Sequence, residues 1–147
     1  MCQEGNVAVN TGNVIKGGLV AGVVNGALGY LAFGVLMKDS MKAQIDALNP
    51  TLSDKMNATP ALVGHIGLGF VTSILMVWTY AAIRATYGPG PGTASRVGLL
   101  FWTALATVYL GDTRDGMYSM HFFLAACGAT LITTLITVNA GCAVYKE

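Results

Sequence analysis

The chain has 147 residues, of which 54% are hydrophobic and only 10% are charged, whereas soluble domains carry about 25% charged residues. Its formal net charge of +1 excludes a basic nucleic-acid-binding face, and its mean hydropathy of +0.59 indicates lipid as the solvent for most of the chain. The length fits a single membrane domain covering residues 1–147.

The first predicted membrane-spanning helix covers residues 14–37. This apolar run exceeds the roughly 20 residues needed to cross the hydrocarbon core and is too long for a signal-peptide core. Gly18, Gly22 and Gly26 recur at every fourth position, which predicts a close helix contact; general enrichment of glycine in membrane helices is the alternative. Asn25 lies beside this face, and we expect its amide to hydrogen-bond across the contact because an unpaired amide in lipid is costly.

A polar segment, residues 38–60, separates the first span from the second. Apolar residues follow helical spacing at its start: Met37, Met41, Ile45 and Leu48. This spacing predicts a short amphipathic helix on the membrane surface, ended by a turn at Asn49–Pro50. A solvated loop is the alternative.

Three further spans are predicted at about residues 61–86, 94–111 and 117–144. Thr59 and Pro60 suit the N-cap and first position of the second helix, and Thr93 or Ser95 is expected to cap the third. The fourth helix carries a second set of small residues at every fourth position: Ala129, Thr133, Thr137 and Gly141. This set predicts another packing face. The expected fold is all-α, a bundle of up-and-down transmembrane helices.

Four predicted spans place both termini and the 87–95 turn on one side of the membrane. Arg84 and Arg96 flank this turn, which holds no acidic residue, so the positive-inside rule predicts that the turn and the termini are cytoplasmic. Trp78 and Trp102 lie inside those arginines by roughly 9 Å along each helix. They are predicted to be interfacial anchors at one depth.

The segment WTYAAIR is followed directly by ATYGPGPGTA. This stretch resembles a pattern in small uncharacterised bacterial integral membrane proteins with four predicted helices, in which Trp-x-Tyr-Ala-Ala-Ile-Arg meets a Gly-Pro-Gly-Pro turn. The matching positions are Trp78, Tyr80 to Arg84 and Gly88 to Pro91. The resemblance implies a multi-pass protein of the bacterial cytoplasmic (inner) membrane and implies no activity.

Motifs for enzymatic or ion-coupled chemistry are missing from the sequence. It contains no HExxH, Walker or nucleophile-elbow motif, and no Asp or Glu within the predicted spans, where proton relays and cation pathways need acids. The Gly-Pro turn does not suit a phosphate cradle, because its prolines remove backbone donors. We therefore expect no catalytic residue and no metal-binding cluster.

The two histidines, His65 and His121, are the candidate cofactor-binding residues. Each follows the start of a helix that begins on the same side of the membrane, so the imidazoles are expected at similar depth. This arrangement suits ligation of haem b or of a chlorophyll-type pigment across the bundle. A structural imidazole that donates to a carbonyl or to Asp112 explains the same residues more simply, so no cofactor is the preferred prediction; another metal is a third alternative.

The leading functional prediction is a non-catalytic accessory or structural subunit of a larger membrane complex, with photosynthetic and respiratory assemblies as candidates. The expected partners are other membrane protein subunits and lipid, and not nucleic acid. The alternatives are a pigment-binding protein that uses the two histidines, and a small uncoupled transporter. A transporter needs a polar path, for which the candidates are Asn25, Thr72, Ser73 and Asn139.

Overall fold

The computed structural model describes residues 9–145, and the regular elements within them are all helices. They are α1 (Thr11–Gly29), the π-helix η1 (Tyr30–Leu36), α2 (Lys38–Leu48), α3 (Leu52–Asn57), α4 (Thr59–Tyr87), α5 (Pro91–Arg114) and α6 (Met120–Val144). Four segments of the described chain are long and apolar enough to cross a membrane: Thr11–Leu36, Thr59–Tyr87, Pro91–Arg114 and Met120–Val144. These segments confirm the predicted all-α, multi-pass bundle.

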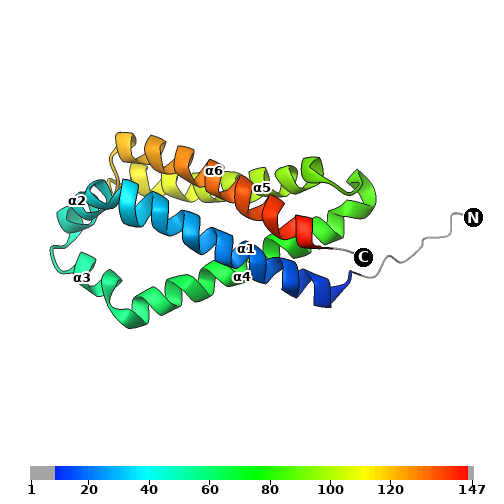
Figure 1. The fold of residues 1–147 in the computed structure, drawn as a ribbon. Coiled ribbons are helices and arrows are strands. Elements are labelled where there is room, and N and C mark those ends of the chain that lie inside the picture. Colours follow the sequence, from blue (N-terminus) through cyan, green and yellow to red (C-terminus); the bar gives the residue numbers. More distant parts are fainter. Residues whose placement is uncertain (1–8, 146–147) are drawn as a thin grey trace, which may run out of the picture.

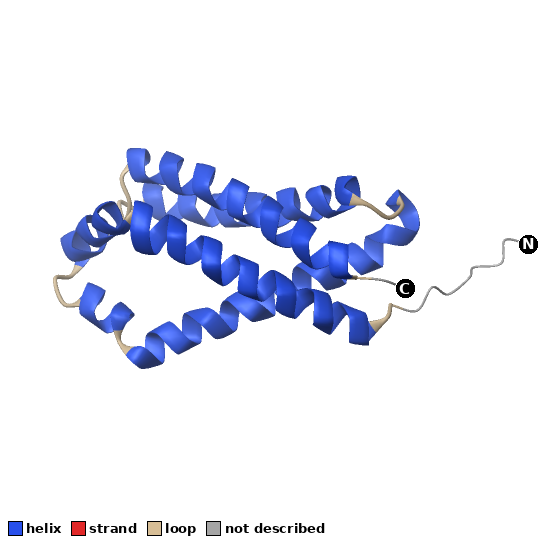
Figure 2. Ribbon diagram, in the orientation of Figure 1, coloured by secondary structure: helices blue, strands red, loops and turns tan. Residues whose placement is uncertain are grey.

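The long helices form a bundle that is packed at one end and splayed at the other (Figure 1). α1 packs along both α4 and α6, and α6 packs along α5. α4 crosses α1, so its C-terminal half approaches α5 and α6 while its N-terminal half stands away from them (Figures 1 and 2). The start of α1, the end of α6 and the α4–α5 turn share the packed end, whereas α2 and α3 lie at the splayed end.

The first span differs from the predicted helix at both ends. It begins earlier than predicted because Asn10 provides the N-cap: its side-chain oxygen accepts a hydrogen bond from the Asn13 N–H at 3.1 Å. It ends as a π-helix, in which the Met37 N–H donates to the Ala32 carbonyl. Glycine is a weak helix former, and Gly34 within this segment is consistent with the loss of regular α-helical bonding.

The start of the third span corrects the predicted cap. Gly88 and Gly90 have φ of 79° and 132°, values that favour glycine, and Pro91 then begins α5. Thr93 does not cap the helix, because its hydroxyl donates back to the Gly88 carbonyl at 2.7 Å, and Ser95 lies inside the helix. The fixed φ of Pro91 starts the helix before either predicted cap residue is reached.

The other predicted boundaries shift by a few residues. Ala58 precedes α4 in an extended conformation, so Thr59 is the first helical residue and not the N-cap as predicted. α5 continues to Arg114, so the connector to α6 moves to residues 115–119. The fourth span begins after Ser119, whose side chain accepts a backbone N–H of the first turn and so provides the cap.

α2 confirms the helix predicted after the first span, and α3 is a further short helix that the spacing did not predict. Ile45, on the predicted apolar face, is buried. Lys42 links the two helices, since its ammonium donates to the Asp46 carboxylate at 2.7 Å and to the Ser53 hydroxyl at 3.3 Å. The bond between Lys42 and Asp46 is the main cause of a lowered pKa of the Asp46 carboxyl and a raised pKa of Lys42.

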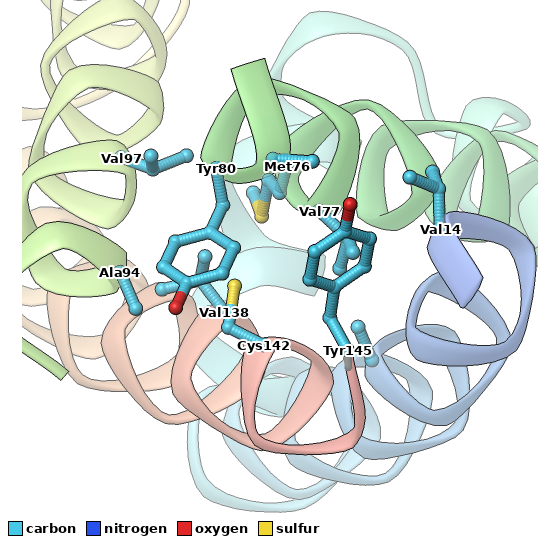
Figure 3. Packing of buried hydrophobic residues seen from close by; sticks show 11 residues of the cluster. Val14, Met76, Val77, Tyr80, Ala94, Val97, Val138, Cys142 and Tyr145 are labelled. Atoms are coloured by element: carbon cyan, nitrogen blue, oxygen red, sulfur yellow. The ribbon is translucent and has the colours of Figure 1, made fainter. Parts of the chain in front are cut away.

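The hydrophobic core at the packed end contains two buried tyrosines (Figure 3). Tyr80 of α4 and Tyr145, just after α6, meet edge to face with ring centroids 6.1 Å apart. Each hydroxyl accepts a backbone hydrogen bond: Tyr80 from the Gly90 N–H at 3.1 Å, and Tyr145 from the Asn10 N–H at 3.3 Å. The two side chains therefore attach the α4–α5 turn and the start of α1 to the same core.

Candidate helix-docking site

Glycines bring α1, α4 and α6 into close contact where the helices cross. A Cβ built on Gly17 would lie 2.7 Å from the Gly141 carbonyl oxygen, and one built on Gly141 would lie 2.8 Å from the Gly17 carbonyl oxygen. On the α4 side, a Cβ on Gly18 would lie 2.8 Å from the Cα of Ile74, and one on Gly22 would meet the ring of Phe70. Side chains at these positions would hold the helices further apart, so the crossing depends on bare backbone.

Past this crossing α1 and α4 separate, although small residues continue along both helices. On α1, steps of three and four residues lead from Gly18 and Gly22 to Asn25 and Gly29 on the same face of the helix. On α4, the same steps lead back from Phe70 to Gly67 and Val63. Apart from the backbone of its own helix, no atom of residues 9–145 lies within 4 Å of a Cβ built on Gly29 or Gly67. We call Asn25, Gly29, Val63 and Gly67 the open seam.

Two turns near the start of α4, from Leu62 to Leu68, have no covered face within the described chain. Every residue from Leu62 to Leu68 is exposed, including 62% of Val63 and 52% of Ile66. Lipid accommodates exposed apolar side chains, but a bare glycine backbone gains little packing from acyl chains and allows another helix to approach closely. This stretch of α4 is therefore a candidate surface for docking a further helix.

Asn25 lies where α1 and α4 begin to separate. Its side-chain nitrogen is 3.3 Å from the Cβ position built on Gly69 of α4. The amide was expected to hydrogen-bond across the helix contact, but it makes no hydrogen bond to any residue between 9 and 145. Asn25 lies near the middle of the first span, where water is excluded, so leaving its amide without a partner is costly.

The predicted small-residue sets only partly coincide with the contacts. Gly26 is exposed, with nothing within 4 Å of a built Cβ, so it does not continue the contact that Gly18 and Gly22 make. On α6, Ala129 and Thr133 are half-buried, whereas the fully buried line is Thr130, Thr134, Thr137 and Gly141.

The two tryptophans predicted to be interfacial anchors have different surroundings. Trp78 is 52% exposed on the surface of α4. Trp102 is half-buried and donates its indole N–H to the Cys127 carbonyl of α6 at 2.9 Å. Trp102 therefore connects α5 to α6, a role that the sequence did not predict.

Replacing Trp102 by Phe is expected to destabilise the protein by about 1 kcal/mol, since it removes one hydrogen bond and keeps most of the aromatic ring. The matched control is Trp78→Phe, which should leave stability unchanged because Trp78 lies on the surface. Thermal unfolding followed by circular dichroism in detergent micelles measures both. Equal melting temperatures for the two variants would contradict a stabilising role for the indole N–H.

Arg84 lies in the last turn of α4 and Arg96 in the first turns of α5, on either side of the Gly-Pro turn, and this turn lies at the packed end (Figure 1). The guanidinium carbon of Arg84 is 5.6 Å from the centroid of the Tyr145 ring, and that of Arg96 is 4.7 Å from the centroid of the Tyr87 ring. These cation–π contacts place both positive charges at the same end of the bundle.

The two histidines have different surroundings. His121 lines a hollow of about 290 Å³ between α2 and the start of α6, and no residue of α4 contributes to its walls. At its edge the Gln44 side-chain oxygen accepts the Ser119 N–H at 2.8 Å, which holds α2 against α6. His65 lies exposed on the separated half of α4. His65 does not line this hollow, so the geometry does not favour a tetrapyrrole held there by both imidazoles.

Apart from Asn25, the residues proposed for a polar path form separate hydrogen bonds that do not connect them to one another. Thr72 and Ser73 donate their hydroxyl hydrogens to carbonyls one turn back in α4, at 2.9 and 2.8 Å. Asn139 donates to the Ser95 hydroxyl of α5 at 3.2 Å and lines a hollow of about 130 Å³ beside Tyr80. The other candidates for the path do not line that hollow. The arrangement gives no support to a continuous route across the bundle.

The described residues contain no group of three or more His, Cys, Asp and Glu side chains that could hold a metal ion. Cys127 and Cys142 are buried free thiols, and Cys2 lies outside the described residues. Comparisons with family models, curated proteins and solved structures find no match for this chain. The open seam is therefore defined only by the contacts within this chain.

Proposed function

We propose that the protein is a non-catalytic structural subunit of a larger membrane assembly, and that its open seam receives a transmembrane helix of a partner chain. The observation that carries the proposal is the unpacked stretch near the start of α4, in which every residue from Leu62 to Leu68 is exposed. A glycine within a helix costs up to about 1 kcal/mol relative to alanine. The glycines at the crossing gain close contacts, whereas Gly29 and Gly67 gain none inside the described chain.

The proposed location is the bacterial cytoplasmic membrane, with the 87–95 turn and both termini in the cytoplasm. The similarity of the WTYAAIR stretch to small bacterial membrane proteins supports the location, and the acid-free turn between Arg84 and Arg96 supports the orientation. Photosynthetic and respiratory complexes are the candidate assemblies.

Purification of the full chain in a mild detergent tests the proposal. We expect the wild-type protein to migrate as part of a larger complex whose other subunits mass spectrometry identifies, and Gly67→Leu to be depleted of them. The leucine fills open space, so the variant should keep the thermal stability of the wild type. Gly128→Leu is the matched control, because Gly128 is exposed with equally open space but lies on α6, away from the seam.

Two results would contradict the proposal. One is a wild-type protein that migrates as a single chain without other subunits. The other is loss of the partners from Gly67→Leu and Gly128→Leu alike. An absorption spectrum of the same sample separates the pigment alternative, because a ligated tetrapyrrole gives an intense visible band that would disappear when His65 and His121 are replaced by Ala.

A further inference from the structure

We propose that the open seam pairs with the open seam of a second copy of this chain, and that the two Asn25 amides hydrogen-bond to each other near mid-membrane. This inference rests on the proposed role of the seam as a helix-docking face, and it identifies the partner chain at the seam as a second copy of this chain.

The amide of Asn25 is the first reason to choose a second copy. It carries two N–H donors and a carbonyl acceptor, so it can satisfy an identical amide. In a two-fold dimer whose axis lies along the membrane normal, both Asn25 side chains lie at the same depth by symmetry. The Asn25 amide, which has no hydrogen-bond partner between residues 9 and 145, then obtains one from the identical residue of the second copy.

Charge is the second reason. A two-fold interface places a surface patch against its own copy, so an ionised residue in the patch would meet a like charge. Residues 17–37 and 59–83, which include the whole seam, contain no Asp, Glu, Lys or Arg. His65, the one histidine in these ranges, lies two positions from Gly67, so its side chain points about 160° away from the Gly67 position around α4. Self-association therefore brings no charges together at the seam.

Shape is the third reason. Gly29 lies one turn beyond Asn25 on α1, and the space in front of it is open, as it is in front of Gly67 on α4. Bare backbone on both sides of a two-fold axis lets two helices approach closely enough for their amides to meet. The glycines at the crossing already use this property inside the chain, where α1 and α6 touch through Gly17 and Gly141.

Cysteine cross-linking in liposomes tests the proposed pairing. Gly29→Cys keeps Asn25 and places a thiol beside the expected axis, in a background carrying Cys2→Ser, Cys127→Ala and Cys142→Ala. In phosphatidylcholine liposomes at high lipid-to-protein ratio, we expect a mild oxidant to convert Gly29→Cys to a covalent dimer. Addition of Asn25→Ala should reduce dimer formation by about 3- to 30-fold, the range for one hydrogen bond between membrane helices. The matched control is Val23→Cys, which is 64% exposed on another face of α1 and should remain monomeric.

The unmodified chain provides a second measurement in case the cysteine-free background folds poorly. Its dimer dissociation constant in detergent, from sedimentation equilibrium, should rise by the same factor on Asn25→Ala. Equal cross-linking of Gly29→Cys and Val23→Cys, or a monomer at all concentrations, overturns the pairing. A monomer that still co-purifies with other subunits overturns the pairing alone, whereas a dimer without other subunits overturns only the proposed larger assembly.

Discussion

Gly141→Ala should destabilise the protein by about 1–3 kcal/mol, the usual cost of adding a methyl group to a core that has no room for it. The new Cβ would lie 2.8 Å from the Gly17 carbonyl oxygen of α1 and 2.9 Å from a methyl carbon of Val77 on α4. The carbonyl belongs to a helix backbone and does not rotate away, so α1 and α6 must move apart. Thermal and denaturant unfolding followed by circular dichroism in micelles measure the loss.

Gly128→Ala is the matched control on the same helix. No neighbouring helix in the described part of the chain has an atom within 4 Å of a Cβ built on Gly128, so the alanine only improves helix propensity and should be neutral or stabilising by a few tenths of a kcal/mol. The pair therefore predicts opposite signs for one chemical change on α6. If Gly141→Ala proved as stable as Gly128→Ala, the backbone contact between α1 and α6 would be wrong.

Tyr145→Ala should cost about 3 kcal/mol, because it removes a buried aromatic ring from the packed end. The ring packs edge to face on Tyr80, lies under the Arg84 guanidinium, and its hydroxyl receives the Asn10 N–H. Its loss should also release the start of α1. Faster amide hydrogen exchange in the first turns of α1, together with a lower unfolding temperature, would show this release.

Two controls separate the contributions of the tyrosine. Tyr145→Phe keeps the ring and removes only the hydroxyl, so it should cost about 1 kcal/mol. Tyr30→Ala removes a ring that is 70% exposed and should have little effect in micelles. A Tyr145→Ala variant as stable as Tyr30→Ala would show that Tyr145 does not hold the chain ends to the core.

The spacing of small residues predicts part of the candidate site, but which residues are selected depends on whether the step is always four or alternates between three and four. A step of four residues advances about 400° around an α-helix, so a set at every fourth position drifts by about 40° per step. This drift explains why Gly18 and Gly22 face α4 while Gly26 is exposed. Alternating steps of three and four stay on one face, and they lead to Asn25 and Gly29.

The same counting explains α6 and shows which signal was overlooked. The buried residues Thr130, Thr134, Thr137 and Gly141 are separated by four, three and four positions, whereas the predicted set kept a strict step of four. Spacing could not identify Gly17 as a contact residue, because the adjacent Gly18 offers equally bare backbone. Only the direction in which α6 approaches α1 makes Gly17, beside Gly141, a contact residue.

The sequence by itself determined the number of spans, their approximate positions and the all-α class, because hydropathy and length respond to the solvent around each helix and not to its neighbours. Tertiary structure alone decided that α4 crosses α1 and separates from it, that the Trp102 indole donates a hydrogen bond to α6, and that the hollow beside His121 does not include His65. These features depend on crossing angles and on the rotation of each helix about its axis. Both are set by contacts between residues far apart in the chain, which no local pattern contains.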